Sequence, residues 1–548
     1  MVNSEIERMT VPKYVHDMRK GQYKKIISPL GAAFLSLGAI LGSGVPFIVA
    51  LVMYFGGPAG LLSWVVAGII ASFIAVVFAE ISAIMPRTGG VAVFPHETNG
   101  PIAGTLSGWG TFVGYILSPL GAAIAIVELL SFFAPSLYDS STGFLSFQGE
   151  LLTLLIVFLF FGTNYLGTSF VNKTNIGWTY LKVFSLVGII IFFLAFDFHP
   201  SNLTSFKGGF MPYGPTGIML GAAATVIAYT GFRQPIEFAE EMKNPKKDMR
   251  KAVLLSVGIA GAIYFLLSLI FIGAINWNTV GLKPGDWSGL GTLAYPLPEL
   301  GFMAGLAIVA YFLFATSIHA TYSCNVVYSG SAARVFAAMS ENGYFPSIFA
   351  RLSKRSVPYV SIFAVLMIQA IYLFLIPAFL SVALAAAGTI LVSYASGGIS
   401  LMVLKIFRSD QSESRVIWWI VTFIAFAAGG LLIYWAGWST VRLVVPSVFV
   451  GLLLLAYHSR KIRISKSAVM GGIWFPVYLA FVMLFSYYGS TYFGGQNVIP
   501  FPLDIIVFCV ISAIFYLWGI RSGLSYMRGK KVQQKNTIQV ETTGESLG

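Results

Sequence analysis

Charged residues are scarce in this chain. Asp, Glu, Lys and Arg make up 10% of its 548 residues, whereas hydrophobic residues make up 57%. Soluble domains carry about 25% charged residues, so this composition excludes an ordinary soluble fold. Long apolar runs follow one another through short loops, without the Pro- or Ser-rich linker that would separate domains. The sequence therefore predicts a single all-α polytopic membrane protein.

Cysteine and histidine are scarce as well. The two cysteines, Cys324 and Cys509, fall in apolar runs and offer no metal-site spacing and no disulfide framework. An integral membrane enzyme would need His, Asp and Glu clustered at an interface, which five scattered histidines do not provide. The sequence also lacks the Gly-Lys-Ser/Thr loop of ATP-driven pumps. We therefore expect no enzyme activity, no cofactor and no metal.

The apolar runs divide into about fourteen candidate membrane spans. They lie near residues 29–55, 58–85, 101–134, 150–171, 174–198, 216–238, 252–276, 302–332, 357–376, 379–404, 416–436, 440–457, 471–489 and 503–520. With the N-terminus placed in the cytoplasm, the cytoplasmic segments carry 29 of the 34 Lys and Arg residues. This asymmetry follows the positive-inside rule and predicts a multi-pass plasma-membrane protein with both termini in the cytoplasm. The net charge of +13 then faces the inner leaflet, so no nucleic-acid partner is expected.

Two of these spans carry residues that weaken a helix at its middle. The first contains Gly-Ser-Gly at 42–44 followed by Pro46, and the sixth contains Gly231 followed by Pro235. Glycine and proline are the residues least suited to a continuous helix. The two spans are five apart in the order of spans. Because five is an odd number of membrane crossings, the five-span unit that begins with the sixth span would be inverted in the membrane relative to the unit that begins with the first. Interrupted spans at matching positions are typical of transporters built from inverted repeats.

Interrupted helices expose backbone groups that can bind a small zwitterion. At each break, one half-helix presents free N–H groups and the other presents free C=O groups. The first set suits a carboxylate and the second suits an ammonium group, so an α-amino acid needs both. A single Gly-rich helix is more often a close-packing surface between helices. The matched pair of breaks favours a binding site over packing alone.

Four stretches resemble the motifs of a known transporter superfamily. They are Gly-Ser-Gly at 42–44, FAEISAIMPRTGG at 78–90, AYTGFRQPIEFAEEMKNPKK at 228–247 and AARVFAAMSENGYFP at 332–346. The stretches are similar to those of the amino acid–polyamine–organocation superfamily of secondary transporters. The resemblance covers residues 29–410 and implies a leucine-transporter-like fold of five-plus-five inverted repeats, with helices 1 and 6 discontinuous.

The resemblance also implies an organisation and a substrate site. Residues 1–28 would be a cytoplasmic segment, 29–410 the transport core, 411–523 four additional spans and 524–548 a cytoplasmic tail, disordered beyond Arg528. The substrate carboxylate would lie on the N–H groups of Ser43 and Gly44. The ammonium group would bind the carbonyls of Ile40, Ile227, Ala228 and Thr230. The full set of substrate-binding residues is Ile40, Gly42, Ser43, Gly44, Ile227, Ala228, Thr230 and Gly231.

Lys182 lies deep in the fifth span, where a lysine is costly unless it faces a cavity or finds partners. In proton-coupled members of the superfamily, a lysine at this position replaces a bound sodium ion. We therefore expect Lys182 to couple transport to protons, with the hydroxyls of Thr321 and Ser323 as possible partners. The alternative is a lysine whose amine snorkels to the inner interface. Glu128 and His319, also in apolar spans, are weaker candidates for a proton relay.

Arg233 departs from the superfamily pattern, which places an acidic residue after Gly-Phe. One hypothesis is that Arg233 attracts a side-chain carboxylate and so biases the site toward acidic substrates. The alternative, which we favour, is a structural pair with Glu237, one helical turn away, or with Glu240. In either case Arg233 and Glu237 are candidates for selectivity or gating.

The sequence as a whole is interpreted as a secondary active transporter that imports amino acids by proton symport and alternating access. An exchanger in the same class stays open, and a channel is less favoured because no filter motif or ring of like charge is present. The expected partners are an amino acid, protons and membrane lipids. The amino acid side chain, the stoichiometry and the oligomeric state are not predicted.

Overall fold

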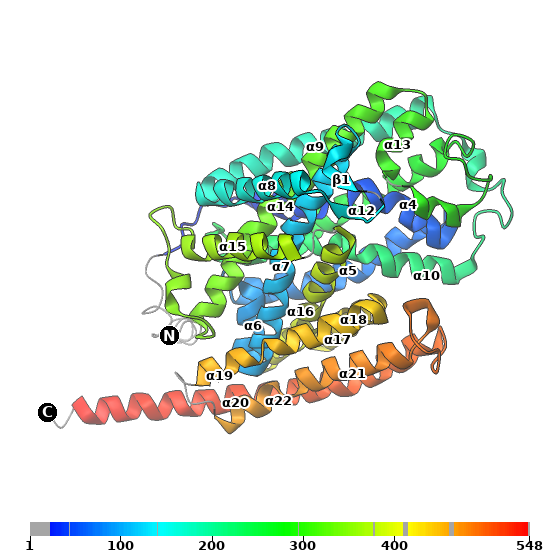
Figure 1. Cartoon of the computed structure of the whole chain (residues 1–548). Coiled ribbons are helices and arrows are strands. Elements are labelled where there is room, and N and C mark those ends of the chain that lie inside the picture. Colours follow the sequence, from blue (N-terminus) through cyan, green and yellow to red (C-terminus); the bar gives the residue numbers. More distant parts are fainter. Residues whose placement is uncertain are drawn as a thin grey trace.

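The computed structural model of the chain is shown in Figure 1. The structure describes residues 22–42, 44–139, 141–293, 295–375, 379–408, 415–459 and 465–545. The α-helices are α3 (Pro29–Ile40), α4 (Val45–Gly56), α5 (Gly60–Ile84), α6 (Gly90–Asn99), α7 (Pro101–Ser131), α8 (Phe147–Tyr165), α9 (Thr168–Phe196), α10 (Gly214–Thr225), α11 (Gln234–Glu237), α12 (Pro245–Ala274), α13 (Pro296–Met303), α14 (Ala307–Glu341), α15 (Tyr359–Leu375), α16 (Phe379–Arg408), α17 (Arg415–Trp435), α18 (Trp438–Val450), α19 (Leu453–Ser459), α20 (Lys466–Gly472), α21 (Trp474–Tyr488) and α22 (Leu503–Glu545).

Short 3₁₀ helices and one small hairpin complete the described structure. The 3₁₀ helices are η1 (Gly57–Ala59), η2 (Pro135–Leu137), η3 (Pro200–Leu203), η4 (Val226–Arg233), η5 (Ala239–Glu241), η6 (Trp287–Thr292), η7 (Ser347–Ala350) and η8 (Thr491–Phe493). The hairpin pairs β1 (Tyr138–Asp139) with β2 (Phe144–Leu145) in antiparallel register. The rest of the secondary structure is helical, so the predicted all-α membrane fold is confirmed.

Twelve segments of the described chain are long and apolar enough to cross a membrane, against the fourteen predicted. The difference comes from two places. The structure joins α4 and α5 through η1 into one apolar segment, Phe47–Ile84, where two spans were expected. The helix α15 is apolar but too short to count, as is α3, the first half of the first predicted span.

Local sequence sets several helix starts. Ser28 precedes α3, and its hydroxyl accepts a hydrogen bond from the Gly31 N–H at 3.1 Å. Pro29 occupies the first turn, where its missing N–H costs nothing. Ser146 caps α8 in the same way, accepting from the Gly149 N–H at 3.2 Å. These starts follow the known preference for serine at the N-cap.

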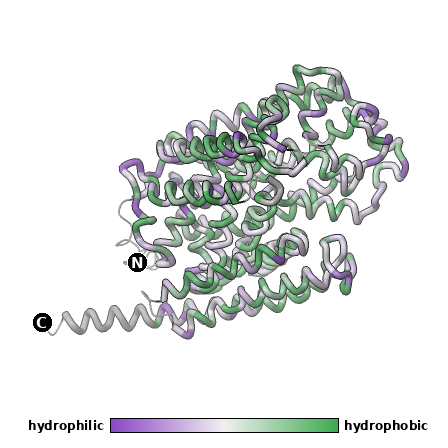
Figure 2. The backbone as a smooth tube through the Cα atoms, viewed as in Figure 1, coloured by the Kyte–Doolittle hydropathy of each residue, from purple (hydrophilic) through white to green (hydrophobic). Residues whose placement is uncertain are grey.

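The helices pack into one bundle whose ends are polar. The helix α16 packs against α7 and α17, and α12 packs against α5 and α3. The later helices α17, α18, α21 and α22 lie together along one side of the bundle in Figure 1. Apolar residues dominate the middle of the helices and polar residues gather at the loops (Figure 2). Large apolar side chains such as Phe184, Phe196 and Ile308 are more than three-quarters exposed, as expected of side chains that face lipid.

The end of the chain differs from its prediction. The helix α22 continues from Leu503 to Glu545, so the segment beyond Arg528 that was expected to be disordered is helical. Residues 1–21, most of the predicted N-terminal segment, lie outside the described residues.

Candidate functional site

Both predicted weak points lie where helical geometry changes. The helix α3 ends at Ile40 and α4 begins at Val45, and of the residues between them Ser43 lies outside the described residues. In the sixth span, α10 ends at Thr225 and is followed by the eight-residue 3₁₀ helix η4. A 3₁₀ helix of this length is uncommon, because its hydrogen-bond geometry is poorer than that of an α-helix.

The two segments are in direct backbone contact. A Cβ atom added at Gly231 would overlap the backbone of Ala39 and Ile40. The buried Ser36 hydroxyl in α3 also donates a hydrogen bond to the Phe232 carbonyl at 3.3 Å. Only glycine allows such a close approach of one backbone to another. The structure thus brings the predicted residues of the first and sixth spans together.

Lys182 binds the end of α3. Its side chain is fully buried, and Nζ donates hydrogen bonds to the carbonyls of Gly38 at 2.8 Å and Leu41 at 2.6 Å. The amine therefore does not snorkel to an interface. The expected partners in α14 are not used: Ser323 donates to its own helix, and the Thr321 hydroxyl has no partner among the described residues.

The remaining carbonyls at the end of α3 are also occupied. The Ile40 oxygen accepts from the Gly42 N–H at 2.9 Å and from the Tyr264 hydroxyl at 2.6 Å. The Cys324 thiol donates to the Ala39 carbonyl at 3.1 Å. With two donors, the Ile40 carbonyl offers no free lone pair to an ammonium group in this state. The sequence did not identify Tyr264 or Cys324, because both come from distant helices.

The η4 segment is half-buried around Thr230. Ile227, Ala228 and Thr230 each retain some exposure, although they lie in the middle of a span. The Thr230 carbonyl accepts from the Tyr394 hydroxyl at 3.0 Å, and the Thr230 and Tyr328 hydroxyls lie 3.4 Å apart. The 3₁₀ helix is therefore held from two other helices, α14 and α16.

Gly44 faces open space at the start of α4. A Cβ atom added there would meet only the Ile48 side chain, at 4.0 Å. The Gly44 N–H donates to none of the described residues. An unpaired N–H at the N-terminus of a helix can donate a hydrogen bond to an anionic group.

Arg233 is fully buried and held by side chains. Its Nε donates to the Tyr115 hydroxyl at 3.0 Å and lies 3.9 Å from the Glu237 carboxylate, and Nη1 donates to the Ser393 hydroxyl. The guanidinium also lies 4.6 Å from the Tyr394 ring centroid. Its Nη2 has no hydrogen-bond partner within the described ranges.

Glu240, the other predicted partner of Arg233, belongs to a second charge cluster. Its carboxylate lies 3.3 Å from Arg87, which also lies 3.3 Å from Glu341. Nearby in sequence, Arg334 binds Glu241 at 2.6 Å. These residues come from three of the motifs, at 78–90, 228–247 and 332–346. The motifs therefore converge at the predicted cytoplasmic end through buried ion pairs.

One face of α9 carries polar side chains that the sequence analysis missed. Asn175 and Thr179 are buried, and they approach the position of a Gly38 Cβ atom at 2.9 and 2.6 Å. Neither the Asn175 amide nor the Thr179 hydroxyl has a hydrogen-bond partner among the described residues. They precede Lys182 by seven and three residues, so helical spacing from Lys182 could have found them.

The other predicted relay residues take no part in the hydrogen bonding of Lys182. The His319 ring packs on Trp178 with ring centroids 4.6 Å apart. Within the described chain, neither His319 nor Glu128 forms a hydrogen bond with Lys182.

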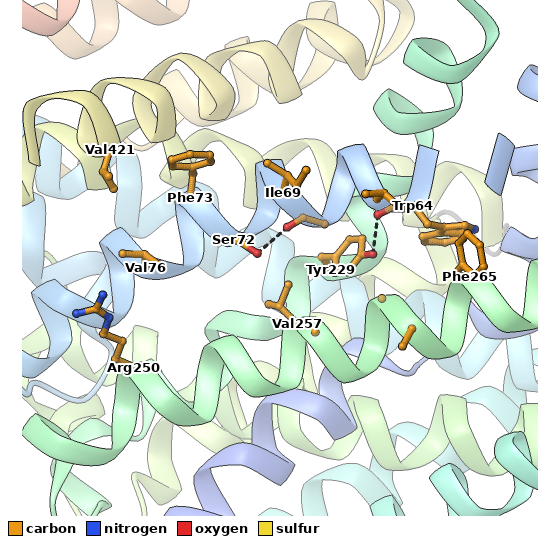
Figure 3. Close-up of a pocket in the computed structure, with 15 residues that line it drawn as sticks. Trp64, Ile69, Ser72, Phe73, Val76, Tyr229, Arg250, Val257, Phe265 and Val421 are labelled. Carbon is orange, nitrogen blue, oxygen red and sulfur yellow. Dashed lines mark hydrogen bonds between the residues drawn. The ribbon is translucent and has the colours of Figure 1, made fainter. Parts of the chain in front are cut away.

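A cavity of about 570 Å³ lies beside η4, between α5, α12 and α17. Figure 3 shows Arg250 at one end and Trp64 and Phe265 at the other. Tyr229 of η4 lines it, but its hydroxyl donates to the Trp64 carbonyl at 3.1 Å. The remaining lining is mostly apolar, so this cavity does not offer the paired donors and acceptors that an amino acid backbone requires.

Comparison with known proteins identifies the family. The sequence model of amino acid permeases matches residues 27–459. The chain belongs to the amino acid permease family. It is similar to the glutamate/serine transporter AimA of Bacillus subtilis (strain 168), with 28% identity covering 89% of this chain and 92% of the relative. It is also similar to the aspartate-proton symporter of the same organism, with 28% identity over 92% and 98% of the two chains.

A third relative, the gamma-aminobutyric acid permease of Bacillus subtilis (strain 168), is 23% identical over 81% of this chain and 95% of its own. The permease is therefore a multi-pass membrane transporter and not an enzyme. Within the described ranges, no three His, Cys, Asp or Glu side chains come together in a way that could hold a metal ion.

Proposed function

We propose that this permease imports amino acids across the cell membrane by proton symport, and that Lys182 carries the coupling. The observation that supports this most is the position of the Lys182 amine on the Gly38 and Leu41 carbonyls. A protonated amine forms charge-assisted hydrogen bonds, which are roughly twice as strong as neutral ones. Loss of the proton would weaken the hold of α9 on the end of α3. The position of α3 would then depend on whether the Lys182 amine is protonated.

The substrate site in this proposal lies between the two interrupted helices. The carboxylate binds the N–H groups at the start of α4, where the Gly44 N–H has no partner in the described chain. The ammonium group binds carbonyls of the half-exposed Ile227 and Ala228. The interruptions would be equivalent points of two inverted five-helix repeats within residues 29–410, which rock about the site.

We further propose that acidic amino acids are among the substrates. Two relatives are named for transport of glutamate and serine and of aspartate with protons. Arg233 has one guanidinium nitrogen, Nη2, without a partner in the described structure, and it follows Thr230 by three residues. A side-chain carboxylate would satisfy this nitrogen if the surrounding tyrosines moved aside. The other guanidinium nitrogens donate hydrogen bonds to Tyr115 and Ser393, and the Glu237 carboxylate lies 3.9 Å away as the counter-charge.

Uptake into proteoliposomes tests both the proton symport and the preference for acidic amino acids. We expect an inward proton gradient to drive accumulation of labelled aspartate or glutamate, and unlabelled acidic amino acids to compete better than neutral ones. Exchange that runs at full rate without any gradient, with no accumulation when a gradient is imposed, would overturn symport in favour of the exchanger. Equal competition by neutral and acidic amino acids would overturn the acidic preference while leaving symport intact.

A further inference from the structure

The cavity between α5, α12 and α17 has the features of a lipid site. It opens to the outside of the bundle at membrane depth, since the lining residues Val65 and Ile69 are more than half exposed. Its lining is apolar for most of its length, and it ends at the exposed Arg250 (Figure 3). A groove of this kind suits a hydrocarbon chain better than it suits a polar solute.

The dimensions match one leaflet of a bilayer. The groove follows α12 from Arg250 to Phe265. At 1.5 Å per residue, fifteen residues of helix span roughly 22 Å. Half of a bilayer, including its headgroup region, is also roughly 20–22 Å thick. One acyl chain with its headgroup therefore fits along the groove.

The charge at the mouth selects the headgroup. No ion pair forms between Arg250 and any acidic side chain of the described residues. Lys246, Lys247 and Lys251 are exposed in the same turns of α12. This end of α12 lies on the predicted inner face, where anionic lipids attract basic clusters. The mouth of the groove therefore favours an anionic phosphate over a zwitterionic headgroup.

Glycines line the groove between its mouth and the proposed substrate site. A Cβ atom added at Gly258 would meet no heavy atom within 4 Å, so this part of the groove is open. At Gly68 and Gly261 the Tyr229 hydroxyl is the nearest neighbour, at 3.2 and 2.9 Å from the added Cβ. The groove thus reaches Tyr229 in the interior of the protein, and Tyr229 lies in η4 between two residues of the proposed substrate site.

We propose that this groove binds one anionic phospholipid, with its phosphate on Arg250 and an acyl chain running past Gly258 to Tyr229. A chain in this position packs between α5 and α12 and stabilises the arrangement of η4 seen here. The inference does not depend on proton coupling or on the choice of amino acid.

Native mass spectrometry and thermal unfolding of the purified permease test the proposal, with phosphatidylglycerol and phosphatidylcholine as probes. We expect one tightly retained phosphatidylglycerol and a melting temperature that rises with its concentration, because a ligand stabilises the state it binds. Phosphatidylcholine should do neither. Equal retention of both lipids would mean that the groove is filled by bulk lipid only, and would overturn the proposal.

Two variants and two matched controls locate the site. Gly258→Phe places an aromatic ring in the open part of the groove, where an added Cβ meets no heavy atom within 4 Å, and should abolish the retained lipid. Gly188→Phe, at an equally open and exposed glycine on α9, should keep it. Arg250→Gln should weaken phosphatidylglycerol binding about fivefold, whereas Lys251→Gln should weaken it less. Unchanged binding in Gly258→Phe, with both glycine variants folded, would place the lipid elsewhere and overturn the proposal.

Discussion

Two of the buried cations in the membrane-spanning helices of this permease, Lys182 and Arg233, are held in different ways. Lys182 donates to two backbone carbonyls at the end of α3. Arg233 is held by the side chains of Tyr115, Ser393 and Glu237, and by the face of Tyr394. The first cation forms no ion pair with any carboxylate of the described structure, whereas the second lies 3.9 Å from the Glu237 carboxylate.

The difference shows what each charge can do. The bonds of Lys182 depend on the position of a helix end, so a change in its protonation acts directly on α3. The bonds of Arg233 depend on side chains from α7, α11 and α16, so its charge holds three elements together. A cation bound to the backbone at a helix end is suited to couple its protonation to movement of that helix. A cation bound by several side chains is suited to hold the helices together, and substitution of those side chains can change which substrate is preferred.

The largest effect is expected from removing Arg233, the cation that is held by side chains. Arg233→Met leaves Glu237 buried without its counter-charge, and removal of one partner of a buried pair costs about 3–5 kcal/mol. We expect a correspondingly lower melting temperature in detergent, and recovery of much of it in the double variant Arg233→Met/Glu237→Gln. Arg442→Met, at an exposed arginine on α18, is the control and should leave the melting temperature unchanged. A melting temperature equal to that of the wild type would show that the pair does not stabilise the fold.

The next effect falls on transport. Lys182→Met keeps the length of the side chain but removes the charge, so it should uncouple uptake from the proton gradient. Coupling free energies of about 1–3 kcal/mol correspond to 5–150-fold changes, and we expect gradient-driven uptake to fall within that range. Gradient-independent counterflow should fall less. Lys173→Met alters an exposed lysine on the same helix and should transport normally. If Lys182→Met retained full pH-dependent uptake, the coupling role would be excluded.

Much of this arrangement could be predicted from sequence. Composition predicted the all-α membrane fold, because a lack of charge over long runs leaves few alternatives. Glycine and proline predicted breaks at residues 42–46 and 231–235; α3 ends at Ile40 and α4 begins at Val45, and η4 is followed by α11 at Gln234. The pair of discontinuities itself stays a prediction. The depth of Lys182 predicted that its amine would need partners, and the structure provides them.

The partners themselves could not be predicted. Tyr115 and Ser393 are 118 and 160 residues from Arg233 in the chain, and helical periodicity carries no information about such pairs. Thr321 and Ser323 are predicted partners of Lys182 because the family resemblance implies that its amine lies between the first and eighth spans. The amine instead reaches the α3 carbonyls, because the end of a helix offers unpaired acceptors that hydroxyls in a continuous helix do not. Twelve apolar segments are counted where fourteen spans were predicted, because α4 and α5 adjoin through η1 and α15 is short.

The smallest expected effect sharpens the comparison with a matched pair of tyrosines. Tyr264 donates to the Ile40 carbonyl on the Lys182 side, and Tyr394 donates to the Thr230 carbonyl beside Arg233. Either Tyr→Phe change removes one neutral hydrogen bond, so each should lower the free energy of unfolding by about 0.5–1.5 kcal/mol. Only Tyr264→Phe should also shift the pH dependence of uptake, because it frees the helix end that Lys182 holds. The pH profile of each variant in proteoliposomes, read beside its melting temperature, separates the two regions. Identical shifts in both profiles would mean that the two cations act on one shared element and not on two.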